Sequence, residues 1–472
     1  MNYEELLQRT TELALAHLAD LPDRPVAHNV TYAEMLERLG GSLPTQGDAP
    51  LHVIEEFVNK AAPGIVATPG PRYFGFVIGG VLPASLAADW LTSVWDQNAG
   101  AFVLSPAAAA VEEIIRGWLI ELFGLAPDMS MGLVTGGTMA NFTGLASGRH
   151  ALLQSIGWDV ETQGLFDAPP ITVVTSDESH VTIFASLQML GLGRERVVRV
   201  ATDAQGRMRP DALEAALAQI HTPVLVCAQA GNVNTGSYDP LTEIVPLVRA
   251  SEGQARRWLH VDGAFGGWAA AVPQLRHLIA GVEQADSFSV DCHKWLNVPY
   301  DSGMVFVRDR AAHYSAMTLS AAYYVAGGAD VRENHNWVPE ASRRARGFAI
   351  YAALRSLGRN GLIETIDRCC RLARRFAAAL AQDAQVEILN EVVINQVLVR
   401  FHPRDNSDVD AFTNAVIRRV QEEGTCWAGG TIWQGKHALR ISVSNWSTTE
   451  TDIDRSAAAI LACLQELNSS LP

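Results

Sequence analysis

Between residues 130 and 307, short valine-rich apolar runs alternate with longer segments that carry a helical pattern. We expect strands at Gly132–Val134, Ile171–Thr175, Val197–Val200, Val224–Ala228, Trp258–Val261, Ser287–Val290 and Gly303–Val307. Helices are expected between most of them, at Met139–Leu153, Ile183–Leu190, Pro210–Ile220 and Leu241–Ala250. Such alternation is typical of parallel strands whose crossover connections are helices. The predicted fold class is therefore α/β, a mostly parallel seven-stranded sheet with helices on both faces.

The two ends of the chain have other patterns. Residues 1–62 carry three helical stretches broken by prolines, with too little apolar sequence for a core, so we expect them to pack on the main body or on a second subunit. Residues 63–338 hold the alternating region, and residues 339–472 mix helices with strands, which predicts a smaller α+β domain. In this last part we expect helices at Pro339–Leu357, Leu362–Ala381, Val409–Glu422 and Glu450–Leu467, and strands at Gln396–Phe401 and Leu439–Val443.

Composition excludes several classes of partner. The net charge of −15 argues against binding to nucleic acid or to an anionic membrane surface. Apolar runs are too short to span a bilayer, and the N-terminus is expected to form an amphipathic helix with acidic residues rather than a signal peptide. The six cysteines show neither a CxxC pair nor zinc-ligand spacing, which predicts reduced thiols, no metal site and a cytoplasmic protein.

The stretch Ser287–Asn297 places His293 and Lys294 side by side where an expected strand ends. A lysine there is either a surface charge or an amine beside a desolvated pocket, where it can form a Schiff base with an aldehyde cofactor. Trp295 and Leu296 favour the second interpretation, because they would shield the amine and desolvation lowers the pKa of a lysine.

A glycine-rich turn, Gly132–Asn141, leads from the first expected strand into a helix. It is neither a P-loop nor the GxGxxG turn of dinucleotide-binding proteins. It is either an ordinary turn with a threonine cap or an anion site. In the second case Gly137 lets the backbone approach closely and Thr138 donates its amide and hydroxyl hydrogens at a helix N-terminus. A phosphate that arrives with a cofactor fits this alternative.

Further polar residues follow other expected strands. Asp262 is either an exposed acid at a strand end or a buried carboxylate with a cationic partner such as a protonated pyridine nitrogen, and Ala264 is small enough for a flat ring to lie against the sheet. His180 is either structural or stacks on a ring and moves a proton. Asn234 either forms a turn or touches a ring edge or a phosphate. All these positions lie at strand C-termini, where doubly wound sheets bind ligands.

In this order, the segments TGGTMAN, SDESH, HVDGA and DCHKWLNVPYDSG resemble the group II pyridoxal-phosphate-dependent decarboxylases, a family that includes aromatic L-amino acid, histidine, tyrosine and glutamate decarboxylases. The resemblance runs from about residue 71 to residue 444. It implies the type I, aspartate aminotransferase-like fold, with residues 1–62 as a dimer clasp, 63–338 as the domain that binds pyridoxal 5'-phosphate (PLP), and 339–472 as the small domain. It also implies a homodimer with active sites at the interface.

The resemblance implies a role for each matching residue. Lys294 is similar to the lysine that binds PLP, Asp262 to the acid paired with the pyridine nitrogen, and His180 to the histidine stacked on the ring; these three would be catalytic. The other implied cofactor contacts are Gly137, Thr138, Asn234, Ala264 and His293. Arg440 resembles an arginine near the substrate carboxylate. The implied reaction is decarboxylation of an L-amino acid to an amine and CO2.

The substrate is expected to be aromatic. Tyr73, Phe76 and Asn98 stand where the pocket of the family falls, in segments that offer aromatic and small residues and no arginine. This composition favours an aromatic or apolar side chain over glutamate.

The chain departs from the family pattern in one loop. Family members often carry a loop tyrosine that supplies a proton to Cα, and here the matching position is Asn334, with Tyr323 and Tyr324 upstream as alternatives. An amide is not a useful acid near neutral pH, so an oxygen-consuming aldehyde synthase stays an alternative, as does an aminotransferase. A binding protein without activity is a third alternative, against which Lys294 and Asp262 together argue.

Overall fold

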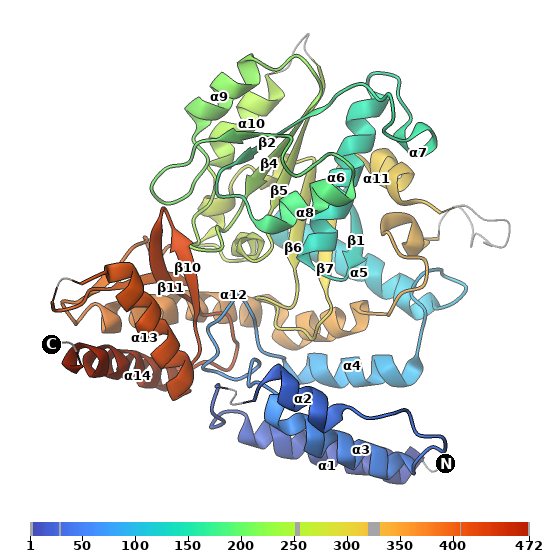
Figure 1. Cartoon of the computed structure of the whole chain (residues 1–472). Helices are drawn as coiled ribbons and strands as arrows, with labels where there is room; N and C mark the ends of the chain where they lie inside the picture. Colours follow the sequence, from blue (N-terminus) through green and yellow to red (C-terminus); the bar gives the residue numbers. More distant parts are fainter. Residues whose placement is uncertain (1–2, 28–29, 251–254, 320–330, 406, 471–472) are drawn as a thin grey trace. The chain divides into compact units, whose positions relative to one another are not determined.

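The computed structural model describes residues 3–27, 30–250, 255–319, 331–405 and 407–470 (Figure 1). They form two compact units. The central unit comprises Gly79–Arg371 and Asn390–Gln396, and the terminal unit comprises Met1–Ile78, Leu372–Leu389 and Val397–Pro472. The N-terminal residues and the C-terminal part of the chain thus belong to one unit although they are far apart in sequence.

A seven-stranded sheet forms the middle of the central unit, in the order β1-β7-β6-β5-β4-β2-β3 (Figure 1). Its strands are β1 (Ser130–Val134), β2 (Thr172–Ser176), β3 (Val197–Val200), β4 (Val224–Gln229), β5 (Arg257–Asp262), β6 (Ser287–Asp291) and β7 (Gly303–Val307). Strands β6, β5, β4, β2 and β3 are parallel, and β7 is antiparallel to both β1 and β6. The predicted α/β class with a mostly parallel seven-stranded sheet is confirmed.

The pairing of β7 brings six strand ends to one edge. Gly303, the first residue of β7, pairs with Val134 at the end of β1 and with Asp291 at the end of β6. Strands β1 and β6 therefore run in the same direction, and the parallel strands β5, β4, β2 and β3 end at this edge too. A side chain that follows any of these strands lies near the others.

Helices cover both faces of this sheet, as the alternation of side chains in β6 shows. Ser289 hydrogen-bonds to Asn141 of α6 (Gly137–Gln154), whereas Phe288 packs edge-on against Phe123 of α5 (Pro106–Phe123), with ring centroids 5.8 Å apart. Successive residues of a strand point to opposite faces, so α6 and α5 cover opposite sides. The other helices of this unit are α4 (Pro83–Trp95), α7 (Val160–Gln163), α8 (Val181–Met189), α9 (Pro210–Ala218), α10 (Leu241–Arg249) and α11 (Arg310–Met317).

Small residues allow α6 to lie close to the sheet. A Cβ atom on Gly144 would come within 2.9 Å of the ring of His260, and one on Gly148 within 3.0 Å of the ring of Trp258. Both rings belong to β5 and are fully buried. Any larger residue at these two positions would push α6 away from the strand that ends at Asp262.

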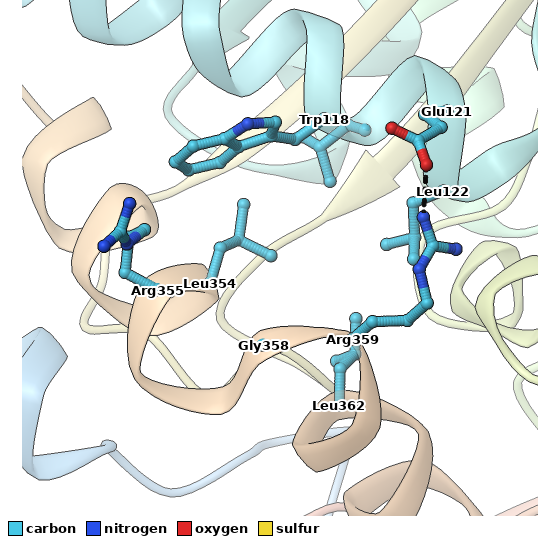
Figure 2. Close-up of a pocket in the computed structure, with 9 residues that line it drawn as sticks. Trp118, Glu121, Leu122, Leu354, Arg355, Gly358, Arg359 and Leu362 are labelled. Atoms are coloured by element: carbon cyan, nitrogen blue, oxygen red, sulfur yellow. Dashed lines mark hydrogen bonds and ion pairs between the residues drawn. The ribbon is translucent and has the colours of Figure 1, made fainter.

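The two helices expected within residues 339–381 form one element, α12 (Gly347–Leu380), interrupted at Gly358, whose φ of 59° and ψ of −176° are not helical. Glycine adopts this positive φ without the strain that a Cβ atom causes. Figure 2 shows Leu354 and Leu362, before and after the interruption, beside a small cavity of about 180 Å³ that they line with Trp118 of α5. The expected break between the two helices therefore lies at Gly358.

The start predicted for the first of these helices is wrong, because α12 begins at Gly347 and not at residue 339. Arg343 lies in the preceding loop, where its guanidinium is fully buried and donates to Glu112 at 2.7 Å and to the carbonyl of Leu133. These bonds hold the segment in a loop whose sequence is compatible with a helix.

The terminal unit contains a four-stranded sheet, in the order β10-β11-β9-β8, and several helices. The strands are β8 (Val386–Ile388), β9 (Gln396–Phe401), β10 (Gly429–Trp433) and β11 (Lys436–Ser442); the helices are α1 (Tyr3–Asp20), α2 (Tyr32–Leu39), α3 (Pro50–Ala61), α13 (Val409–Glu423) and α14 (Glu450–Ser469). Strands β8 and β10 and helices α4, α5, α7 and α11 were missed in the sequence. Of these, α4 and α5 begin with a proline at the first helical position, which was an available indication.

Candidate active site

A cavity of about 440 Å³ lies at the edge where the strands of the central unit end. Six of the residues that line it were predicted from the sequence: Gly137, Thr138, His180, Ala264, His293 and Lys294. They come from four separate segments, which follow β1, β2, β5 and β6. The structure thus brings together most of the residues expected to hold a cofactor.

Lys294 enters the cavity from the segment that follows β6. Its Nζ atom lies 5.9 Å from the centroid of the Phe265 ring, which the sequence analysis did not single out. Trp295 and Leu296 are fully buried, and the ring of Trp295 packs edge-on against that of Phe265, with centroids 6.1 Å apart. The backbone of Lys294 is also confined, since a Cβ atom on Gly79 would lie 2.0 Å from its carbonyl oxygen.

Asp262, at the end of β5, is buried, with 4% of its surface exposed. Its Oδ2 accepts a hydrogen bond from the Asn141 amide at 3.0 Å, and its Oδ1 accepts one from the backbone N–H of Ala264 at 3.1 Å. Among the residues that the structure describes, no lysine, arginine or histidine forms an ion pair with it. A buried carboxylate that no described side chain pairs with a positive charge fits a cationic group supplied by a ligand, such as a protonated pyridine nitrogen.

His180 follows β2 and is the N-cap residue of α8. Its Nδ1 accepts the backbone N–H of Thr182 at 3.4 Å and lies 2.8 Å from the Oγ1 of the same residue. The ring is half-buried and lines the cavity. Its position is therefore fixed by the first turn of a helix.

The N-terminus of α6 forms another wall of the cavity, and Gly136, its N-cap residue, has no side chain with which to cap it. The N–H of Gly137 donates to Oδ2 of Asp291 at 3.0 Å, so an acid that the sequence analysis missed already occupies this donor. The other oxygen, Oδ1, lies 2.7 Å from Nδ1 of His293, at ion-pair distance but not aligned as a hydrogen bond. Thr138 completes a cradle of the kind that suits a phosphate.

Two expected contact residues are held in turns. Asn234 donates its backbone N–H to Oδ1 of Asn232 at 2.8 Å and is not one of the described residues that line the cavity. Asn98 accepts from the backbone of Gly100 at 2.9 Å and of Arg343 at 3.2 Å. The cofactor contact of Asn234 and the substrate contact of Asn98 stay predictions.

The remaining expected substrate residues belong to the terminal unit. Tyr73 and Phe76 both stack on Trp427, with centroid distances of 5.0 and 5.9 Å and interplanar angles of 2° and 11°. Gly75 between them is required, because a Cβ atom there would lie 2.0 Å from the Trp427 ring. Arg440 lies on β11, and burial lowers the pKa of its guanidinium. Trp427, which the sequence analysis missed, is thus the centre of an aromatic cluster.

Asn334, at the expected position of the loop tyrosine, is buried in a short 3-10 turn (Asn334–Trp337). Its amide donates to the carbonyl of Ala99 at 3.1 Å and accepts from Arg332 at 2.8 Å. The alternatives Tyr323 and Tyr324 lie outside the described residues. Within those residues, no cluster of three histidine, cysteine or acidic side chains is arranged to hold a metal ion. No described helix is both long enough and apolar enough to cross a membrane.

Most of the chain is similar to known proteins. The family model of the pyridoxal-dependent decarboxylase conserved domain matches residues 33–402. Among curated proteins, the chain is 26% identical to an aromatic-L-amino-acid decarboxylase of Bacillus atrophaeus over 100% of this chain and 98% of the relative. It is 27% identical to tyrosine decarboxylase 2 of Arabidopsis thaliana, over 93% and 82% of the two chains.

The fold is also similar to that of solved structures. Superposition on Oryza sativa TDC, crystallised with PLP and tryptamine, gives a TM-score of 0.90 over 99% of both chains at 22% identity. The type I fold expected from the sequence is therefore confirmed. Because the family model covers most of the chain, this protein belongs to the pyridoxal-dependent decarboxylase family and is a PLP-dependent carboxy-lyase.

Proposed function

We propose that this protein decarboxylates an aromatic L-amino acid to the corresponding amine and CO2. One observation carries the proposal: Lys294, His180 and the N-terminus of α6 line a single cavity beside the buried carboxylate of Asp262. An amine, an aromatic stacking surface, an anion cradle and a counter-charge for a ring nitrogen are the four parts that PLP requires of a protein.

Each of these residues has a proposed task. Lys294 binds the cofactor covalently through Nζ, and Asp262 keeps a proton on the pyridine nitrogen. Thr138 and the first turn of α6 hold the phosphate, with His293, whose Nδ1 lies 2.7 Å from Oδ1 of Asp291, as a further phosphate contact. PLP, when bound, supplies an electron sink that accepts the electron pair left at Cα as CO2 departs.

The aromatic side chain of the substrate is proposed on two grounds. Tyr73, Trp427 and Phe76 form a stack of three rings, and Phe76 is 59% exposed, so an aromatic face is available to a ligand. Offset stacking of a further ring would be favourable there. The names of the two curated relatives point to aromatic substrates as well. Arg440 is proposed to receive the substrate carboxylate.

The proton that returns to Cα is proposed to come from His180 or from a tyrosine at 323 or 324. Asn334 is fixed by bonds to Ala99 and Arg332, and an amide is not an acid near neutral pH, so we do not assign it this task.

We propose a homodimer, with residues 1–62 as a clasp, residues 63–338 as the cofactor domain and residues 339–472 as the small domain. Helix α4 buries its polar Ser85 and Thr92 while Leu91 and Val94 are exposed, the reverse of a helix in a monomer. An apolar cavity of about 590 Å³ lies beside these residues. In the terminal unit, α1 and α2 bury none of their residues. The six cysteines, all free and buried, support a cytoplasmic location.

The test is to incubate the purified enzyme in air with a panel of L-amino acids and to measure CO2, amine, aldehyde and peroxide together. We expect CO2 and amine in equal amounts from one or more aromatic amino acids, and less from glutamate. Aldehyde and peroxide in step with CO2, with little amine, would establish the oxidative alternative. Release of CO2 from glutamate alone would overturn the substrate class.

A further inference from the structure

A chain of buried hydrogen bonds runs behind the cavity and joins Asp262 to His180. Its centre is Asn141, a fully buried residue in the first turns of α6. The Nδ2 atom of Asn141 lies 3.0 Å from Oδ2 of Asp262 and 3.1 Å from Oγ1 of Thr182. The Thr182 hydroxyl lies 2.8 Å from Nδ1 of His180.

Donor and acceptor roles along this chain follow from its ends. A carboxylate only accepts hydrogen bonds, so the amide nitrogen of Asn141 must face Asp262 and its Oδ1 must face the other way. There Oδ1 accepts from Ser289 and lies 3.0 Å from Nε2 of His260. The proton of His260 is therefore on Nε2.

The hydrogen bonds on the other side of His260 independently place its proton on Nε2. The indole N–H of Trp258 donates to Oγ of Ser287 at 2.9 Å, which leaves the Ser287 hydroxyl to donate to Nδ1 of His260 at 2.8 Å. Burial lowers the pKa of His260 to about 4, so the ring is neutral. Every group that meets Asn141 thus has a fixed role, which also fixes the orientation of the amide.

The orientation of the Asn141 amide also fixes the donor and acceptor roles at the cavity, where Thr182 meets His180. Thr182 accepts from Asn141, and its own hydroxyl hydrogen is then directed to Nδ1 of His180. The backbone N–H of Thr182 approaches the same nitrogen at 3.4 Å and is only a donor. In neutral His180 the proton must therefore reside on Nε2.

We propose that Asn141 is a positioning residue of this active site, which orients the carboxylate of Asp262 and, through Thr182, keeps the proton of His180 on Nε2. The proposal rests on the roles proposed above for Asp262 and His180. Asn141 would thus connect Asp262, the proposed partner of the ring nitrogen, to His180, the proposed stacking residue, without itself touching the reacting atoms.

The direct readout is NMR of the holoenzyme labelled with ¹⁵N-histidine, with the His180 signals identified by their loss in His180→Gln. We expect unprotonated Nδ1 and protonated Nε2 at neutral pH. A wild-type spectrum with the proton on Nδ1 would overturn the proposal. This spectrum does not depend on turnover, so it distinguishes failure of this inference from failure of the proposed decarboxylase activity.

Two variants of Thr182 test its hydrogen bond to His180; Thr182 lies in the first turn of α8, where the risk of misfolding is low. Thr182→Val keeps the shape and removes the hydroxyl, so that the 3.4 Å bond from the backbone N–H is left at Nδ1 of His180. We expect the Nδ1 signal of His180 to shift and kcat to fall about tenfold, the value of one lost hydrogen bond, while KM changes little. Thr182→Ser keeps the hydroxyl and should restore the wild-type signal. An unchanged His180 signal in Thr182→Val would overturn the link to His180.

Asn141→Asp tests the hydrogen bond from Asn141 to Asp262. An aspartate still accepts from His260 and Ser289 but cannot donate to Asp262, and we expect PLP to dissociate with about 10- to 100-fold weaker affinity. The matched control is Ser147→Ala on the same helix, a fully buried hydroxyl that bonds only the carbonyl of Thr143 in its own helix. Circular dichroism establishes that each variant folds. If Asn141→Asp and Ser147→Ala bind PLP with equal affinity, Asn141 does not orient Asp262. If Asn141→Asp does not fold, Asn141→Leu, which keeps the volume, takes its place, and we expect the same loss of PLP affinity.

Discussion

Lys294 provides an amine in the cavity at the strand ends and is the proposed point of covalent attachment of the cofactor. Borohydride reduction of the holoenzyme should therefore fix the cofactor mass to the peptide that contains Lys294. In Lys294→Ala we expect this label to be lost and turnover to fall by about a thousandfold or more, as when other covalent catalysts lose their reacting group. Label at another lysine would contradict the assignment.

Asp262 is expected to act through its charge, since it is buried without a cationic partner among the described residues. In Asp262→Asn the volume is kept and the charge is lost, so we expect kcat to fall by about a thousandfold, roughly 4 kcal/mol of barrier, with PLP affinity weakened less. Asp309→Asn, at the N-cap of α11, is the matched control, because asparagine caps a helix as well as aspartate does. Equal kcat in the two variants would remove Asp262 from the mechanism.

Among single residues, half of those that line the cavity could be predicted from the sequence. Residues directly beyond a strand could be predicted, because parallel strands must end at one edge. Phe265, Asp291 and Asn141 were missed, since their tasks follow from contacts between distant segments, such as the bond between Asp291 and the amide of Gly137. No residue spacing in the sequence predicts a contact between segments that are this far apart.

At the scale of elements, the segment after β6 is held by the close approach of Gly79. Its backbone N–H donates to the carbonyl of His293 at 3.2 Å, and a Cβ atom on Gly79 would meet the carbonyl oxygen of Lys294 at 2.0 Å. Gly79→Ala must displace backbone, so we expect loss of about 2 kcal/mol or more of stability together with weaker PLP binding.

Gly117→Ala is the control for this prediction. Gly117 is in α5 with no atom within 4 Å of an added Cβ, so alanine there should stabilise the protein by about 0.5–1 kcal/mol. Thermal unfolding and PLP titration of the two variants measure the difference. Similar unfolding temperatures would contradict the contact between Gly79 and Lys294.

Elements with a strong period could be predicted, and those shaped by distant partners could not. The valine-rich strands and the helices between them were found because burial on both faces gives a continuous apolar run. Strand β10 was missed because most of its residues are only half-buried or exposed, and its pairing with β11 forms it. The late start of α12 follows from the buried ion pair between Arg343 and Glu112, which no local pattern predicts.

For the whole molecule, buried histidines predict loss of stability in acid. Burial lowers the pKa of His313 to about 3 and that of His260 to about 4, against about 6.5 in the unfolded chain. Between these values the unfolded state binds protons that the folded state does not, so the free energy of unfolding falls as pH falls from 6.5. The raised pKa of Asp239, about 7, acts in the opposite direction and weakens this slope.

His313→Gln isolates one of these groups, because Asp239 and His260 are the same in both proteins. We expect the variant to be less stable at pH 7.5 but its unfolding temperature to depend less on pH between 6 and 4. The difference corresponds to about 1.4 kcal/mol per pH unit for one proton. Parallel curves for the two proteins would show that His313 is protonated when folded.

The exposed face of α4 predicts how the protein assembles. Leu91 and Val94 are 46% and 64% exposed on α4, a helix that buries Ser85 and Thr92, and an apolar cavity lies beside Leu91. If a second copy covers this face, Leu91→Glu with Val94→Glu places unpaired charges in the interface of both subunits. We expect the dimer dissociation constant to rise on the order of 100- to 1000-fold, because burying an unpaired charge costs several kcal/mol.

Phe166→Glu is the matched control, since Phe166 is 91% exposed as a single apolar side chain and should leave the dimer intact. Light scattering over a range of concentrations measures the molecular mass, and PLP content measures how much cofactor the site retains. If active sites lie at the interface, the charged α4 variant should lose activity upon dilution while wild type and Phe166→Glu keep it. A fully active monomer would show instead that each chain completes its own site, and the exposed face of α4 would then need another explanation.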